Sequence, residues 1–394
     1  MFTSWPGKYQ KIIGKAFMVL GVHLEDVLQV GNHELPEFDT FLPLWIEYLG
    51  KQSGRRASEL LKEAQSLVQD DVVLVENARK YVNEHPELYL QILKMKAASG
   101  MDDRMLEIGL EAIDAIPSKL LVRSTISLWT AHYAHKLCRF DIREKCWLEA
   151  FRSDPSVINY LRIKFLLWDS KQYHDQILSI VDTAFKESKS NGNRSLSFAE
   201  NMRESSISRN DYCSMMFFEQ QFDRMEKTGM SVKENLGWSS TFMKEGLAFL
   251  LLLLYRGDAY PVGMRSMLSR SMSACGFTKE AFYFGKGEAD DKTDIEVFTG
   301  ILADWKDTVD LSEKEVDKWL KKLDTWIRRR VCGIMDANRR NYYGECAGFI
   351  AAFGEVQESL GETGAKARIM EQYRKEYSRR RAFHEELRRY GMRK

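Results

Sequence analysis

The sequence predicts an all-α protein, an α-solenoid built from antiparallel helix pairs. Apolar residues recur at spacings of three and four along most of the chain, which is the period of a helix with one buried face. The strict apolar–polar alternation that is typical of a half-buried β-strand is absent. Only seven prolines occur in 394 residues, and most of them lie between the periodic segments, where they do not interrupt a helix.

Several stretches predict individual helices. An apolar stripe follows Ser312, and Glu315 stands three residues after that serine, the spacing of a capping box. Shorter stripes run over 173–184 and over 349–360, the second closed by Gly361, a residue that readily adopts the left-handed conformation of a helix stop. The stripe after Ser312 consists of Val316, Leu320, Leu323, Ile327, Val331 and Ile334.

Two stretches need a decision between alternatives. The apolar run 247–255 (LAFLLLLLY) has nine residues, whereas a membrane span needs about 20, so it predicts a deeply buried helix and no membrane partner. The β-branched stretch 72–75 (VVLV) leads into a helical pattern and is interpreted as helix.

The predicted helices come in pairs. Segments 86–99 and 102–116 form one pair, 119–137 and 141–152 the next, and 156–169 and 173–188 a third. Units of about 31–38 residues are typical of solenoids, in which each pair covers the apolar stripe of its neighbour.

Part of this region resembles tetratricopeptide repeats, whose second helix carries a large apolar residue, an alanine three later and a proline five beyond. Trp147, Ala150 and Pro155 have this spacing, and Ala131 falls where the first helix takes a small residue. The resemblance covers residues 86–190, without the tryptophan and tyrosine positions of the family's first helix. The flanking units keep part of the pattern: Ala112 and Pro117 with Gly109 in the place of the large residue, and Val181 and Ala184 without a proline.

The C-terminal stretch from Asn341 to the end is similar to the tail of a group of bacterial helical proteins. This second resemblance covers roughly residues 100–394. Some larger relatives of that type carry a SWIM-type zinc finger, but its Cys-x-Cys and Cys-x-His pattern is missing from this chain, so no zinc ligand is implied. The resemblance implies an accessory or scaffold protein.

A polar segment divides the predicted arrays. Residues 186–209 are rich in serine and asparagine and include Gly192, a composition typical of loops and linkers. The sequence therefore predicts an N-terminal helical-repeat array over 1–190, a linker or long loop over 191–209, and a C-terminal helical array with a basic end over 210–394.

No motif predicts catalysis, a metal or a cofactor. His132, His135 and Cys138 share a helix, but spacings of three turn them through about 120° around it, too far for one ion. The six cysteines are scattered without CxxC pairs, which favours reduced thiols in the cytoplasm. The N-terminus has no apolar run of the signal-peptide type.

The C-terminal part is basic. Residues 320–394 hold 18 Lys and Arg against 10 Asp and Glu, although the net charge of the whole chain is +1. Arginine clusters with interleaved tyrosines can bind phosphate and stack on bases, but such charges also pair on ordinary solvated helices. The candidate partner- or nucleic-acid-binding residues are Arg328, Arg329, Arg330, Arg339, Arg340, Arg379, Arg380, Arg381, Arg388 and Arg389.

The function predicted from these observations is that of a non-catalytic helical-repeat scaffold. Such an array exposes a concave surface that binds a protein or peptide partner. The alternative is a nucleic-acid-associated protein that uses the C-terminal arginines. An enzyme would require a deep pocket with clustered carboxylates, and the sequence nominates no residue for it.

Overall fold

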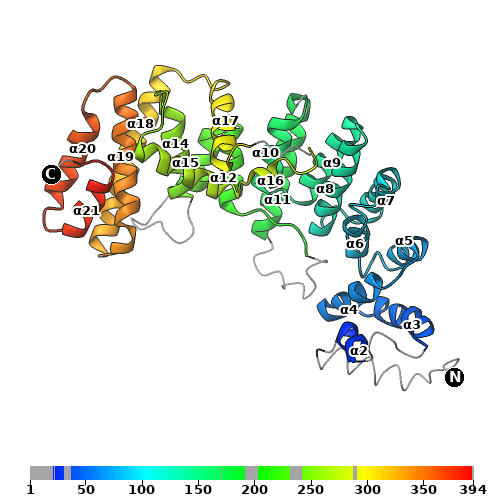
Figure 1. Cartoon of the computed structure of the whole chain (residues 1–394). Coiled ribbons are helices and arrows are strands. Elements are labelled where there is room, and N and C mark those ends of the chain that lie inside the picture. Colours follow the sequence, from blue (N-terminus) through cyan, green and yellow to red (C-terminus); the bar gives the residue numbers. More distant parts are fainter. Residues whose placement is uncertain are drawn as a thin grey trace. The chain divides into compact units, whose positions relative to one another are not determined.

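The computed structural model describes residues 21, 23–30, 37–168, 170–190, 203–230, 242–286 and 291–392. Every regular element within these ranges is a helix (Figure 1), and the one β-type contact is an isolated bridge between Leu120 and Glu204. The all-α prediction is therefore confirmed. None of the described helices is long and apolar enough to cross a membrane.

The helices form two packed units. Unit 1 takes residues 1–155, 162–206 and 283–288, and unit 2 takes 156–161, 207–282 and 289–394. The predicted boundary at 191–209 lies mainly outside the described residues. Where the chain is described again, Leu121 N donates to Arg203 O at 3.0 Å and Ser205 N to Lys119 O at 3.0 Å. The end of this polar segment is thus paired with the backbone that leads into the next helix of unit 1.

Unit 1 consists of helices that pack on their neighbours in the chain. Its elements are α2 (Leu24–Val30), α3 (Phe38–Gly50), α4 (Arg55–Ser66), α5 (Asp71–Lys80), α6 (Glu87–Met95), α7 (Asp102–Ala115), α8 (Leu121–Lys136), α9 (Phe140–Ser153), η1 (Ser170–Tyr173) and α11 (His174–Ser190), and the boundary with unit 2 falls within α10 (Val157–Leu166). The helix predicted from the β-branched stretch 72–75 is confirmed as α5.

The close packing of α7 against α8 explains one departure from the repeat pattern. A Cβ on Gly109 would lie 2.2 Å from Oγ1 of Thr130, so no side chain fits where the pattern has a large residue. In the next pair Ala131, Trp147 and Ala150 are fully buried, as the pattern requires.

The buried face of α11 differs from the prediction. Ile177, Val181 and Phe185 face the core, at 1%, 0% and 8% exposure, whereas Tyr173 and Ala184 are partly exposed. The stripe follows a uniform spacing of four, while the predicted set took 173, 177, 180 and 184. A helix with several apolar positions permits more than one such stripe, and packing selects between them.

Unit 2 has a continuous apolar core. Its elements are α12 (Arg209–Phe218), α13 (Phe222–Met225), η3 (Glu226–Met230), α14 (Met243–Leu254), α15 (Val262–Ala274), α16 (Lys279–Phe282), α17 (Asp294–Lys306), α18 (Glu313–Asp336), η4 (Arg340–Tyr342), α19 (Tyr343–Ser359), α20 (Ala365–Glu376) and α21 (Arg381–Arg389). The apolar run 247–255 is buried throughout in and just after α14, as predicted. The predicted capping box of Ser312 and Glu315 opens α18, and Gly361 with φ +104° follows α19.

Candidate functional site

The surface of α8 and α9 in unit 1 carries a turn from a distant part of the chain. This turn, Tyr283–Lys286, is closed by a hydrogen bond of 2.7 Å from Lys286 N to Tyr283 O, and we call it the aromatic turn. Gly285 has φ +85°, which suits glycine at the third position of a type II β-turn. The hydrogen bond between Trp147 and Phe284 joins residues 137 positions apart in the sequence.

Three side chains of α8 and α9 contact the aromatic turn. The indole Nε1 of Trp147 donates to the carbonyl oxygen of Phe284 at 3.2 Å. The ring of Phe284 meets Trp129 edge-on, with centroids 5.5 Å apart, and lies 6.2 Å from the ring of His132. Edge-to-face packing of this kind is favourable because the positive edge of one ring meets the negative face of the other.

Neighbouring side chains hold these three in place. Trp147 is fully buried, and the guanidinium of Arg143 lies 4.7 Å from its ring centroid. Burial lowers the pKa of His132, helped by the positive charge of Lys136 and partly opposed by Asp102. His132 is therefore neutral near pH 7, and its imidazole behaves as one more ring of the aromatic cluster.

Glycine at position 285 is favoured by the fit of the turn. A Cβ there would lie 3.2 Å from Nε1 of Trp147, 3.3 Å from Cβ of Ala131 and 3.3 Å from N of His132. Phe284 itself is only half-buried. The surface therefore accepts one aromatic ring and one backbone carbonyl, and it leaves little room for a side chain after the ring.

Sequence reasoning did not find this site. None of residues 283–286 is among the candidate site residues nominated from the sequence. A usable signal was present: three aromatic residues, Phe282, Tyr283 and Phe284, precede the glycine, which is unusual for a solvated loop. The residues that receive them could not be identified from local patterns.

The predicted arginines occupy different environments. Arg330 is buried, at 2% exposure, and binds Glu345 with Nη2–Oε1 2.7 Å. Arg328 pairs with Asp324 on α18, and Arg389 pairs with Glu386 on α21. The other candidates on the surface are Arg329, Arg339, Arg340, Arg379, Arg381 and Arg388, all exposed.

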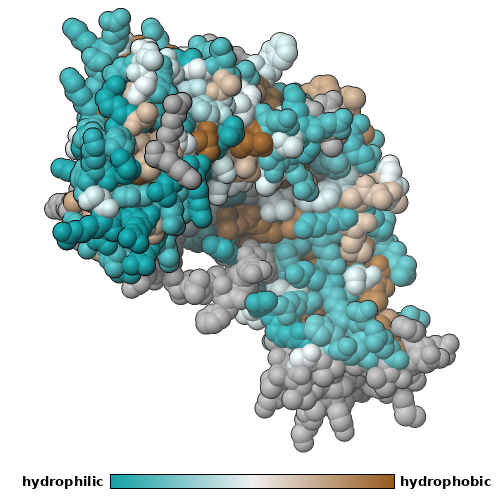
Figure 2. Space-filling view, turned by 60° about the vertical axis from the view of Figure 1, so that its left-hand side comes forward, coloured by the Kyte–Doolittle hydropathy of each residue, from teal (hydrophilic) through white to brown (hydrophobic). Residues whose placement is uncertain are grey.

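Two loops that carry candidate arginines, residues 338–340 and 379–381, meet at the end of α18. We call them the arginine loops. Arg380 donates to Oδ1 of Asn338 at 2.6 Å and to the carbonyl of Met335 at 3.0 Å. Cations suit this place because the carbonyl end of a helix carries partial negative charge. Arg380 therefore stabilises the helix end, and the exposed neighbours on both loops are brought together around it. In Figure 2 the left-hand part of the surface, where the C-terminal helices lie, is largely hydrophilic.

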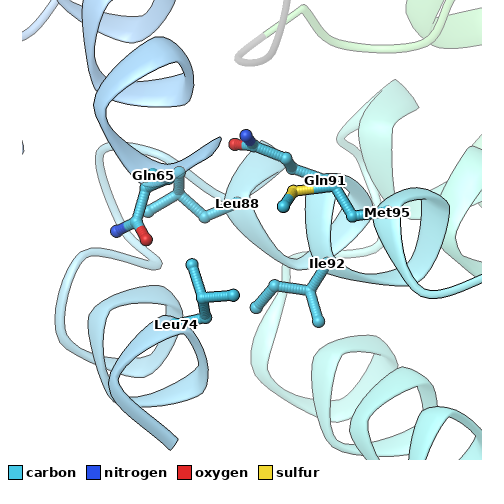
Figure 3. Close-up of a pocket in the computed structure, with 6 residues that line it drawn as sticks. All are labelled: Gln65, Leu74, Leu88, Gln91, Ile92 and Met95. Carbon is cyan, nitrogen blue, oxygen red and sulfur yellow. The ribbon is translucent and has the colours of Figure 1, made fainter. Parts of the chain in front are cut away.

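A small hollow between α4, α5 and α6 does not provide a ligand site. Gln65, Leu74, Leu88, Gln91, Ile92 and Met95 line it (Figure 3). The space is too narrow for a water molecule. The buried amide of Gln65 has no hydrogen-bond partner there, which lowers the stability of this corner of the unit.

Over the described ranges, no three His, Cys, Asp or Glu side chains are grouped as metal ligands. The pKa of Lys306 falls to about 8 because of burial and the nearby Arg256. Its amine donates to the carbonyl of Tyr255 at 2.7 Å, so this lysine closes the end of α14.

The chain was also compared with known proteins. No protein-family model, no curated protein and no solved structure matches it.

Proposed function

We propose that the chain is a non-catalytic scaffold of stacked, tetratricopeptide-like helix pairs, and that it binds a protein or peptide partner on the surface of α8 and α9. Consecutive helices pack side by side from α5 to α9. The small and large residues of the repeat pattern at 131, 147 and 150 are buried in the α8–α9 pair. Such pairs present side chains of the first helix to a partner.

One observation carries the proposal: the α8–α9 surface already holds a short peptide turn. Its contacts are those of protein recognition, with an aromatic anchor against Trp129 and an indole that hydrogen-bonds a backbone carbonyl. Aromatic side chains dominate the energetics of many interfaces. The hydrogen bond contributes about 1 kcal/mol and each ring contact about 0.5–1.5 kcal/mol.

The proposal is tested by capturing partners on the immobilised full chain, comparing wild type with Trp129→Ala. We expect one or more proteins held by wild type to be lost with Trp129→Ala, because the variant removes the main aromatic contact of the surface. Leu360→Ala is the control, since Leu360 is an exposed apolar residue of unit 2, and circular dichroism checks that helix content is unchanged.

Trp168→Ala distinguishes the α8–α9 surface from another place on unit 1. Trp168 is 95% exposed, so it offers an alternative aromatic contact. Partners that survive Trp129→Ala but are lost with Trp168→Ala would contradict binding at α8–α9. Partners that survive both variants would contradict it as well.

A second candidate function, binding of nucleic acid, is favoured by the meeting of the two arginine loops. Arg339, Arg340, Arg379 and Arg381 are exposed around the contact of Arg380 with Asn338. In a gel-shift series, binding by these residues should weaken steeply with salt because counterions are released. The informative variant is Arg379→Ala with Arg381→Ala, which leaves Arg380 in place. An unchanged gel shift and salt dependence in this double variant would exclude these arginines as the binding site.

A further inference from the structure

We propose that the α8–α9 surface recognises a β-turn with an aromatic residue followed by glycine at its centre, and that the aromatic turn of this chain occupies the site as an internal competitor. This inference rests on the proposed binding at α8–α9 and narrows it to one class of ligand. It is carried by the way in which Phe284 and Gly285 fit against Trp129, Ala131 and Trp147.

The two central residues of the turn, Phe284 and Gly285, are recognised in different ways. The ring at 284 is recognised through the faces and edges of Trp129 and His132. At 285 a side chain is disfavoured, because a Cβ would lie only 3.2–3.3 Å from Trp147 and the backbone of His132, so these neighbours would have to shift. Its positive φ adds a conformational preference for glycine.

The outer residues of the turn, Tyr283 and Lys286, contribute less to recognition than the two central ones. The amine of Lys286 lies 5.4 Å from the ring centroid of Tyr283, so these two side chains contact each other within the turn. The carbonyl of Phe284, in contrast, is fixed by the indole of Trp147, and a backbone group is available in any peptide. The expected consensus is therefore an aromatic residue and glycine, with tolerance on either side.

The ring of Phe284 is only half-buried, so the inference requires the internal turn to exchange with a free ligand. A tethered segment has an effective concentration on the order of millimolar, which favours occupancy in the absence of a partner. A free ligand then binds only the fraction of molecules in which the turn has left. Its apparent dissociation constant is therefore the intrinsic constant divided by the open fraction.

The experiment uses a fluorescein-labelled peptide, KEAFYFGK, with the sequence of residues 279–286, and measures its binding to the full chain by anisotropy. Phe284→Ala removes the internal ring, and Gly285→Ala blocks the seating of the turn without removing the ring. If the wild-type site is open in one molecule in ten, both variants bind the peptide about tenfold more tightly than wild type. Adding Trp129→Ala to either variant should abolish this gain.

Two altered peptides test what is recognised. KEAFYAGK lacks the ring, and KEAFYFAK places a methyl group in tight contact with Trp147 and His132, so both should compete more weakly than KEAFYFGK. Equal binding of KEAFYFGK to wild type and to both folded variants would overturn the internal competition. Equal binding of all three peptides would overturn the aromatic–glycine recognition.

A measurement on the wild-type chain covers the case in which the variants fail to fold. Excess KEAFYFGK should speed hydrogen exchange of the backbone at 283–286, while α8 remains protected. No change at saturating peptide would overturn the inference. If the peptide fails in every assay but a captured partner is still lost with Trp129→Ala, the ligand class is wrong and the scaffold proposal stands.

Discussion

The buried guanidinium of Arg330 lies against the carboxylate of Glu345, with Nη2 at 2.7 Å and Nε at 3.0 Å from the same oxygen, Oε1. Arg270 and Lys244 approach the other oxygen of Glu345 at 3.4 and 3.9 Å. The contact thus joins residues of α14, α15, α18 and α19. An arginine that the sequence marks as a binding residue here holds helices of unit 2 together.

Replacing Arg330 should therefore destabilise the fold. Arg330→Ala removes one partner of a buried ion pair and leaves the carboxylate of Glu345 less well compensated. Such a change lowers the free energy of unfolding by about 3–5 kcal/mol. Arg329→Ala is the matched control, because Arg329 is exposed and surface substitutions change stability by about 0.5 kcal/mol or less. Urea unfolding followed by circular dichroism compares the two, and equal midpoints would show that the Arg330 pair contributes nothing.

The contrast between neighbouring arginines shows what the sequence could and could not predict. Arg330 lies seven residues after Leu323 and three after Ile327, so helical periodicity does place it on the buried stripe of α18. Reading 328–330 as one basic cluster overlooked this, because consecutive residues on a helix point about 100° apart. The partner Glu345 belongs to another helix, and no local spacing identifies it.

The approach of α7 to α8 gives a second prediction. In Gly109→Ala the new Cβ would lie 2.2 Å from Oγ1 of Thr130, and overpacking of this kind costs about 1–3 kcal/mol. Gly300→Ala is the control, since Gly300 is exposed within α17 and its Cβ would meet nothing within 4 Å. This variant should stabilise by about 0.5–1 kcal/mol because alanine has the higher helix propensity.

A double variant tests whether Gly109→Ala destabilises the protein through its clash with Thr130. Thr130→Ala removes Oγ1 and Cγ2, so Gly109→Ala combined with Thr130→Ala should recover part of the loss, and the coupling is measured by a double-mutant cycle in urea. Strict additivity of the two changes would contradict a steric origin. A stabilising effect of Gly109→Ala alone would contradict the close approach itself.

Helix identity was more predictable than helix contacts. The stretch 72–75 and the capping box at Ser312 depend on residues close in sequence, and both became the predicted helices. The register of α11 depended on which apolar residues meet the core, and there the prediction was wrong. The contact of Trp147 with Phe284 spans 137 residues, so it depends on tertiary packing that periodicity does not encode.

The N-terminus of α15 gives a third prediction, because a buried carboxylate caps it. Glu355 accepts from Gly263 N at 3.1 Å, Met264 N at 2.8 Å and Lys366 Nζ at 2.6 Å. Glu355→Gln removes the charge from these bonds and should cost about 1.5–3 kcal/mol. Glu358→Gln, at an exposed residue of the same helix, should cost much less, and a thermal melt of both variants compares them. Similar melting temperatures would rule out a special role for Glu355.

A buried histidine gives the last prediction, a dependence of stability on pH. His85 is fully buried, and its Nε2 lies 2.8 Å from Gln52 O and its Nδ1 3.4 Å from Glu87 Oε1. Burial alone would lower its pKa, but the carboxylate of Glu87 and the carbonyls of Gln52 and Leu49 outweigh it, so the pKa is raised.

The sign follows from linkage. A raised pKa means that folding favours the protonated imidazole, so this stabilisation is fully present below the unfolded pKa of about 6.5. It is lost as pH rises through the higher folded pKa. We expect the urea midpoint of wild type to fall as the pH rises above about 6.5, and His85→Gln to flatten that fall, because glutamine keeps polar contacts without titrating. An unchanged slope in His85→Gln would show that another group titrates, since the two proteins would then share the same linkage.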